Sequence, residues 1–117
     1  MSAPMPNKTP EPPYYAVIFA SRLAPDDNGY AQMGERMAEL AAQQPGYLGA
    51  DSARGTDGFG ITVSYWSSPE AIARWKENME HLVAQDKGKR EWYEQYEVRV
   101  AKVERAYGKR PQNGAEG

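Results

Sequence analysis

The amino-acid sequence predicts an α+β fold of the ferredoxin-like type, with strands and helices in the order βαββαβ. Two observations predict it. Four runs rich in β-branched and aromatic residues are interleaved with two segments whose apolar residues recur at helical spacing. The two middle runs are joined by a short turn bounded by glycines, which is typical of a hairpin. We therefore expect one antiparallel sheet with both helices on one face.

The length of 117 residues fits a single domain with one hydrophobic core. Prolines recur from Pro4 to Pro13, and such a stretch cannot bury enough apolar surface to become ordered. Residues 1–13 are therefore expected to be a flexible N-terminal tail. The polar, glycine-rich residues 109–117 predict a flexible C-terminal tail, which leaves residues 14–108 as the folded domain.

The first predicted strand is Tyr14–Leu23, where aromatic and β-branched residues are dense. A helix follows, with Asp27 or Asn28 as its N-terminal cap. Its apolar residues at helical spacing are Tyr30, Met33, Met37, Leu40 and Ala41. Pro45 and Gly46 are expected to end this helix.

The second and third strands form the predicted hairpin. Tyr47–Arg54 is the second strand, in which Gly49 marks a bulge or a close approach of another backbone. Residues 55–58 (Gly-Thr-Asp-Gly) form the turn, and Gly60–Trp66 alternates apolar and hydroxyl residues as a hairpin partner does.

The second helix has a strong start signal. Ser67 is the predicted cap, Pro69 lies in the first turn, and Glu70 is placed to complete a capping box from Ser67. Helix is expected to resume after a kink near Gly88 and to run toward Trp92. The predicted buried stripe of this helix is Ile72, Trp75, Met79 and Leu82.

The last strand begins near Tyr93, and its apolar phase shifts at Ala101, which predicts a bulge. This strand carries more apolar side chains than one short domain covers. We expect the sheet face opposite the helices to pair in a homodimer. The side chains that this dimer would bury are Val98, Val100, Val103 and Tyr107.

Composition excludes several classes of function. The net charge of −2 is too small to attract nucleic acid or an anionic membrane. The chain has no cysteine, which excludes disulfides, thiolate nucleophiles and thiolate metal ligands. One histidine and the lack of an HExxH motif indicate no bound metal. The N-terminus resembles neither a signal peptide nor a membrane span, so we expect a cytoplasmic location.

Residues 63–108, VSYWSSPEAIARWKENMEHLVAQDKGKREWYEQYEVRVAKVERAYG, carry a family resemblance. A strand ends in Tyr65-Trp66, Ser-Pro-Glu opens the helix, Trp75 follows, and His81 comes six residues later. Together with AVIFASRL and PGYLGADSARG, this spacing resembles the antibiotic biosynthesis monooxygenase family from about Tyr14 to Tyr107. The resemblance implies a dimeric α+β barrel. Some members oxidise polycyclic aromatic compounds with dioxygen and neither metal nor flavin, and others bind and cleave heme.

His81 is the first candidate catalytic residue. Histidine is the side chain whose unperturbed pKa best suits proton transfer near neutral pH. The alternative is that His81 lies on a solvated helix face beside Glu77, Glu80 and Gln85. A pocket with His81 pointing inward would favour catalysis, and His81 in solvent would favour a binding function.

Aromatic and polar residues near His81 complete the candidate site. Trp75 is expected to form a pocket wall and to share in catalysis, and aromatic walls suit a flat substrate. The same aromatic residues are equally consistent with core or dimer interface. Arg22 or Arg54 could hold a carboxylate or phenolate with two hydrogen bonds. The substrate-binding candidates are Ser21, Ser64, Tyr65, Trp66 and Arg22.

The heme-degrading branch of the resembling family implies an asparagine on the first strand, a tryptophan on the second helix and a histidine beyond it. Trp75 falls in the tryptophan position, and His81 is the only possible axial ligand. Ser21 stands where the asparagine would be, and its hydroxyl has a shorter reach.

The sequence thus favours a cofactor-independent monooxygenase that acts on a small aromatic or quinol-type compound as a homodimer. No cofactor is expected, although heme is possible. The alternatives are a heme-binding or heme-degrading monooxygenase and a non-catalytic dimer of the same fold that binds a small ligand.

Overall fold

The computed structural model describes residues 10–23, 30–84 and 93–109. Its elements are β1 (Tyr14–Leu23), α1 (Tyr30–Ala42), β2 (Tyr47–Arg54), β3 (Phe59–Trp66), α2 (Pro69–Ala84) and β4 (Tyr93–Val103). The βαββαβ order predicted from the sequence is confirmed. The predicted cap of the first helix at Asp27 or Asn28 and the kink near Gly88 lie outside the described residues, as do most of the two predicted tails.

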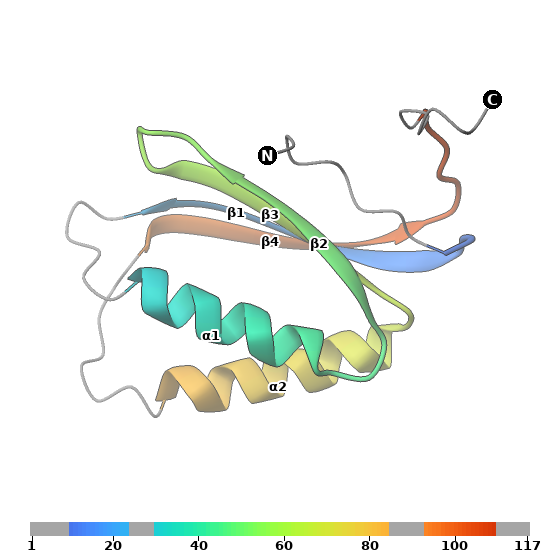
Figure 1. The fold of residues 1–117 in the computed structure, drawn as a ribbon, viewed down its shortest axis with the longest axis horizontal. Coiled ribbons are helices and arrows are strands. Elements are labelled where there is room, and N and C mark those ends of the chain that lie inside the picture. The colour runs from blue at the N-terminus through green and yellow to red at the C-terminus, as the bar shows by residue number, and fades with distance from the viewer. Residues whose placement is uncertain (1–9, 24–29, 85–92, 110–117) are drawn as a thin grey trace, which may run out of the picture.

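The four strands form one antiparallel sheet in the order β2-β3-β1-β4. Both helices lie on the same side of this sheet (Figure 1). The central position of β1 and β3 follows from the split βαβ arrangement, in which each helix carries the chain back across the sheet. Neither described helix is long and apolar enough to cross a membrane.

The β2–β3 hairpin has the predicted turn. The amide of Gly55 donates to the carbonyl oxygen of Phe59 over 2.8 Å, and the amide of Gly58 donates to that of Gly55 over 3.0 Å. Gly58 has φ +93°, a left-handed conformation that glycine adopts without strain. A register shift between Tyr47 and Gly49 produces the predicted irregularity in β2.

The pleat of the sheet sorts its side chains onto two faces. Val17 packs with the helices, so the residues opposite it and every second residue along each strand lie on the same helix-facing side. Across β2, β3, β1 and β4 in order, three rows on this side are Ala50, Ser64, Val17 and Val100; Ser52, Thr62, Phe19 and Val98; and Arg54, Gly60, Ser21 and Tyr96. The opposite side is the open face.

The register corrects the expectation for the last strand. Val98 and Val100 lie on the helix-facing side and not on the open face, because they pair with Phe19 and Val17. Val103 does lie on the open face, opposite Tyr14. The bulge is at the other end of β4, where the partner of β1 shifts between Gln95 and Tyr93, and not at Ala101.

The core lies at the end of β3. Trp66 is fully buried at 0% exposure and packs with Ala41 of α1 and Ala71 of α2. Val17, Tyr47, Ile72 and Trp75 pack around these residues. The alanines have short side chains, which lets both helices approach the indole ring closely.

The cap of α2 is Ser68 and not Ser67 as the sequence predicted. The Oγ atom of Ser68 accepts a hydrogen bond from the amide of Ala71 over 3.1 Å, which satisfies an amide of the first turn. Ser67 lies one residue before the cap, and its amide donates to the carbonyl oxygen of Gly46 over 2.8 Å. The capping box with Glu70 therefore has the wrong register.

Gly46 joins the end of α1 to this same corner. Its φ is +90°, and a Cβ atom built on it would lie 2.6 Å from the Cβ of Ala71 and 2.8 Å from the Oγ of Ser67. Any side chain here would meet both backbone strain and overlap with the first turn of α2.

We predict that Gly46→Ala lowers the free energy of unfolding by about 1–3 kcal/mol, because the new methyl group separates α2 from the α1–β2 turn. Thermal unfolding followed by circular dichroism measures the change. Gly108→Ala is the matched control, since a Cβ there meets no atom within 4 Å. Equal melting temperatures for Gly46→Ala and the wild type would contradict the prediction.

Candidate functional site

One cross-strand row on the helix-facing side brings a cation, a buried hydroxyl and an aromatic ring together. Arg54 of β2 lies opposite Gly60 of β3, Gly60 lies opposite Ser21 of β1, and Ser21 lies opposite Tyr96 of β4. The row therefore crosses the whole sheet. It lies far along the strands from Trp66, where the helices pack.

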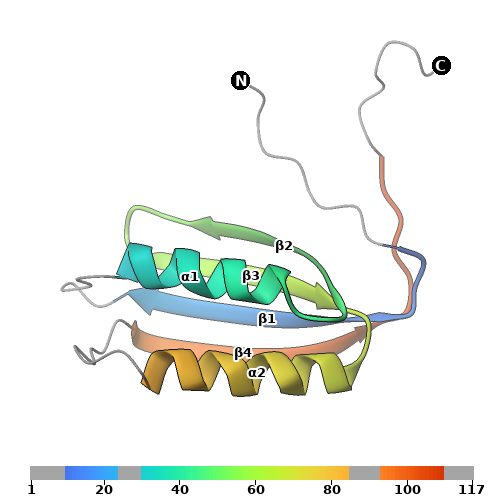
Figure 2. The same cartoon turned by 60° about the horizontal axis from the view of Figure 1, so that its bottom comes forward.

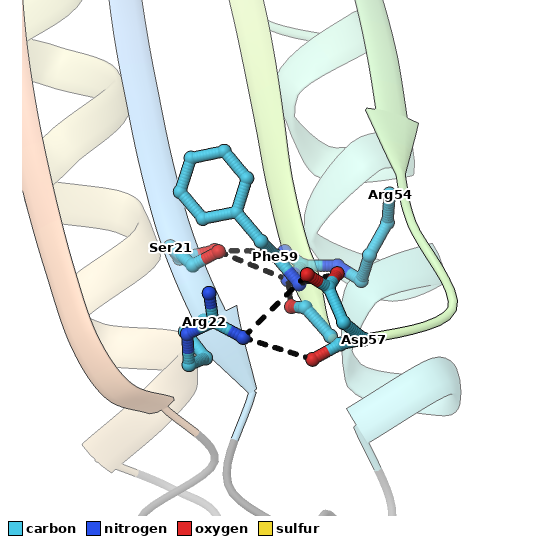
Figure 3. Close-up of polar contacts among 6 residues, drawn as sticks. Ser21, Arg22, Arg54, Asp57 and Phe59 are labelled. Carbon is cyan, nitrogen blue, oxygen red and sulfur yellow. Dashed lines mark hydrogen bonds and ion pairs between the residues drawn. The ribbon is translucent and has the colours of Figure 1, made fainter.

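The side chain of Arg54 runs across Gly60 and reaches Ser21 (Figure 3). Its Nη2 atom lies 2.7 Å from the Oγ of Ser21, and its Nη1 atom lies 3.2 Å from the carbonyl oxygen of Ser21. Nη1 also donates to the carbonyl oxygen of Gly58. A Cβ on Gly60 would lie 2.9 Å from the Cζ of Arg54, so this path exists because residue 60 is glycine.

The surface beside this row is apolar on β1 and β4. The rings of Phe19 and Tyr96 have their centroids 5.7 Å apart and are tilted by 30°. Although the two helices lie on this side of the sheet, Tyr96, Val98 and Val100 are 60%, 48% and 58% exposed. We call Phe19, Tyr96, Val98 and Val100 the apolar surface.

The half of the helix-facing side formed by β2 and β3 is polar. The Oγ of Ser52 and the Oγ1 of Thr62 share a hydrogen bond of 2.7 Å. Ser64, a predicted substrate-binding residue, accepts a hydrogen bond from the Nε1 of Trp66 over 2.9 Å. This bond satisfies the buried indole N–H and assigns Ser64 a structural task.

Two predicted site residues form a stacked pair in the core. The rings of Trp66 and Trp75 have centroids 6.1 Å apart and are inclined by 19°. Trp66 is fully buried and has no surface for a ligand, whereas Trp75 on α2 is half-buried. Trp75 thus keeps exposed area on the side of the molecule that carries the apolar surface.

His81 lies in the last turn of α2 and is exposed. An α-helix turns by about 100° per residue, so His81 is about 120° around the helix axis from Trp75 and about 180° from Ile72. Both of those residues pack toward the core. His81 therefore lies on the outer side of α2, away from the apolar surface, and its predicted catalytic role remains a prediction.

The two remaining predicted residues lie on the open face. Arg22 donates from Nη1 to the carbonyl oxygen of Asp57 over 3.0 Å, and its guanidinium lies 5.7 Å from the ring centroid of Phe59 (Figure 3). The Oη of Tyr65 donates to the Oδ2 of Asp51 over 2.9 Å. The structure thus divides the predicted site residues between two faces of the sheet and the outer side of α2.

The carboxylate of Asp51 influences two tyrosines. Burial, the hydrogen bond to Asp51 and its negative charge raise the pKa of Tyr65 to about 12. Burial, followed by the charge of Asp51, also raises the pKa of Tyr47. Tyr65 is therefore a neutral hydrogen-bond donor near neutral pH and not a base.

The described residues do not provide a metal or heme site. No three His, Asp or Glu side chains among them lie close enough together to hold a metal ion. For heme, the single histidine of the sequence lies on the outer side of α2, and Trp75 is stacked on Trp66. Ser21, in the expected asparagine position, is 2% exposed and bonded to Arg54. The ligand set of the heme-degrading branch is not reproduced.

The protomer has the fold of antibiotic-biosynthesis-type monooxygenases, an α+β ferredoxin-like domain with a four-stranded antiparallel sheet. The chain belongs to the monooxygenase af470-like family, whose model matches residues 22–115. A curated relative is the uncharacterized protein YqjZ of Bacillus subtilis, which is 59% identical over 99 residues covering 85% of this chain and 87% of YqjZ.

Solved structures share the fold at low sequence identity. A mutant of SnoaB, a cofactor-independent oxygenase from Streptomyces nogalater, superposes with a TM-score of 0.68 at 13% identity and covers 84% of this chain and 100% of its own. A mutant of MhuD with two manganese protoporphyrin IX molecules per active site gives a TM-score of 0.61 at 18% identity, covering 81% and 99%. At these identities the likeness shows the fold alone.

Arg54 is the site residue that sequence reasoning weighed and left out in favour of Arg22. A signal for it was present, because the turn at 55–58 sets the hairpin register that places Gly60 opposite Arg54. A glycine opposite an arginine leaves room for the longer side chain to cross the strand. The destination of that side chain, Ser21, depends on the pairing of β1 with β3 and had no local signal.

We predict that Asp51→Asn lowers the pKa of Tyr65 from about 12 toward its ordinary value of 10.0, because the charge and the strong acceptor are lost while burial remains. The folded-state pKa is raised, so the pair contributes stability that is complete below pH 10 and is lost as the pH rises to about 12. Tyrosinate absorbance of wild type minus Tyr65→Phe isolates this titration. A midpoint near 10 in the wild type would contradict the assignment.

Proposed function

We propose that the protein is a cofactor-independent monooxygenase that oxidises a small, flat aromatic or quinol-type compound on the apolar surface of β1 and β4. The observation that carries this proposal is the exposure of Tyr96, Val98 and Val100 on the side of the sheet where the helices lie. Large apolar side chains left open beside a fixed cation are typical of small-molecule sites. The oxygenase SnoaB, which shares the fold, supports the reaction class.

The proposed reaction balances without an external reductant. A ring CH2 group of an anthrone-type substrate loses two hydrogen atoms and becomes a carbonyl group. One atom of dioxygen enters the substrate, and the other leaves as water with the two hydrogen atoms. The four electrons that reduce dioxygen come from the substrate, so the protein needs to bind the ring, stabilise its anion and exclude water.

We predict that the full chain accelerates the oxidation of dithranol, an anthrone, to its quinone with one dioxygen consumed per quinone formed. Val98→Asp is expected to lower kcat/KM at least about tenfold, because a desolvated carboxylate on the apolar surface disfavours the ring. Quinone absorbance and an oxygen electrode measure the two rates. Lys102→Gln is the control, since Lys102 lies on the same strand and side but in a polar position.

The outcomes of this experiment separate the alternatives. No acceleration over buffer by a folded wild-type chain would contradict the proposed reaction. The role of His81 as base predicts that His81→Ala lowers kcat about a hundredfold and changes the pH profile of kcat. Full activity of His81→Ala would contradict that role and leave the oxygenase proposal intact.

The second candidate function is a small-ligand-binding dimer without catalysis. The exposed position of His81 on the outer side of α2 favours it, because no histidine then faces the apolar surface. This function predicts saturable binding of dithranol, sensitive to Val98→Asp, with no oxygen consumption above that of buffer. Turnover by the wild type would exclude it.

We also infer that two copies pair through the open face, as the dimeric barrel of this fold requires. Ile18, Phe59, Ile61 and Val63 gather there on β1 and β3, and Phe59 and Ile61 are each 42% exposed. A sheet face with such side chains is stabilised by burial against a second sheet.

We predict a mass in light scattering of twice the 13.1 kDa of one chain. Ile61→Lys is expected to shift the protein toward the monomer, because the interface would then bury a charge. A wild-type monomer at micromolar concentration would contradict this pairing.

A further inference from the structure

The guanidinium group of Arg54 is held in place at the edge of the apolar surface. Three hydrogen bonds join it to the hydroxyl and carbonyl oxygens of Ser21 and to the carbonyl oxygen of Gly58, and all three acceptors are uncharged. An arginine side chain stays protonated at any pH the protein tolerates. A fixed positive charge therefore lies on the helix-facing side, partly buried, beside β1.

The aromatic end of the same row lies one strand away. Ser21, which the guanidinium contacts, is directly opposite Tyr96, and neighbouring strands are about 4.8 Å apart. Tyr96 and Phe19 continue into Val98 along the apolar surface. A flat ring resting on these side chains has one edge directed at β2 and β3, the side from which Arg54 reaches across.

We propose that Arg54 is a substrate-binding residue that takes an anionic oxygen, a phenolate or a carboxylate, on the edge of the aromatic substrate. This assignment rests on the proposed function and narrows the substrate class from flat aromatic compounds to those that carry an acidic oxygen. Hydrogen bonds between a guanidinium and an anionic oxygen are stronger than neutral ones and fix orientation. Stabilising the phenolate also favours the electron-rich form that reacts with dioxygen.

Ser21 and Gly60 act through Arg54 as positioning residues. Ser21 is only 2% exposed, so its hydroxyl holds the guanidinium and is not open to a substrate. Gly60 leaves the space that the Cζ of Arg54 fills. An arginine that is ordered before binding loses less conformational entropy when the substrate arrives.

The test compares two probes that differ in charge, naphthoate and naphthamide, by calorimetric titration of the full chain at neutral pH. The wild type is expected to bind naphthoate about tenfold to a hundredfold more tightly than naphthamide. Arg54→Gln removes this preference while naphthamide affinity is unchanged. Gly60→Ala weakens the preference by displacing the side chain, and Arg54→Lys retains part of it because the charge remains.

Lys102→Gln is the matched control, because it also removes one positive charge from the helix-facing side and is expected to keep the full preference. Equal binding of the two probes by the wild type overturns the role of Arg54 and leaves the apolar surface as a neutral-ring site. An equal loss of both probes in Arg54→Gln shows a structural role and likewise overturns the proposal. Binding of neither probe by the wild type, together with no dithranol oxidation, overturns the proposed function itself.

Discussion

The burial of Trp66 is the constraint on which the rest of the structure depends. Its ring lies 5.4 Å from that of Tyr47 and 6.1 Å from that of Trp75, measured between centroids. Trp66 ends β3, so these contacts join the sheet to the end of α1 and the start of α2. The helices are anchored at this end of the sheet. The row from Arg54 to Tyr96, at the other end of the strands, contributes none of the packed core residues, and Tyr96 is left open to a ligand.

The sequence contained enough local information to predict every element in order. Strand and helix periods, the turn at 55–58 and the proline and glycine after α1 are signals within a few residues, and the structure agrees with them. The position of His81 relative to Trp75 was also calculable, since six residues of helix separate them by about 120°. A rotation estimated before the structure would have placed the two on different sides of α2.

Features that depend on pairing between distant strands could not be predicted. Alternation along β4 indicated that Val98 and Val100 share a face, but which face depends on the register with β1. The contact between Arg54 and Ser21 depends on the register of β1 with β3 across 33 residues of sequence. The cap at Ser68 was missed for a different reason, because two adjacent serines fit the same motif and only tertiary contacts distinguish them.

The β2–β3 turn links the two faces of the sheet. On the open face, Arg22 binds the carbonyl oxygen of Asp57; on the helix-facing side, Arg54 binds that of Gly58 (Figure 3). The amide of Leu23 donates to the same Gly58 oxygen over 3.1 Å, so the end of β1 is fixed to the turn as well (Figure 2). Since β1 and β3 supply alternate residues to both faces, a slip of one residue would remove Ser21 from Arg54 and Phe59 from Arg22 together. Because its two arginines hold the turn from opposite sides, that register is the common requirement of the binding surface and of the face proposed for pairing.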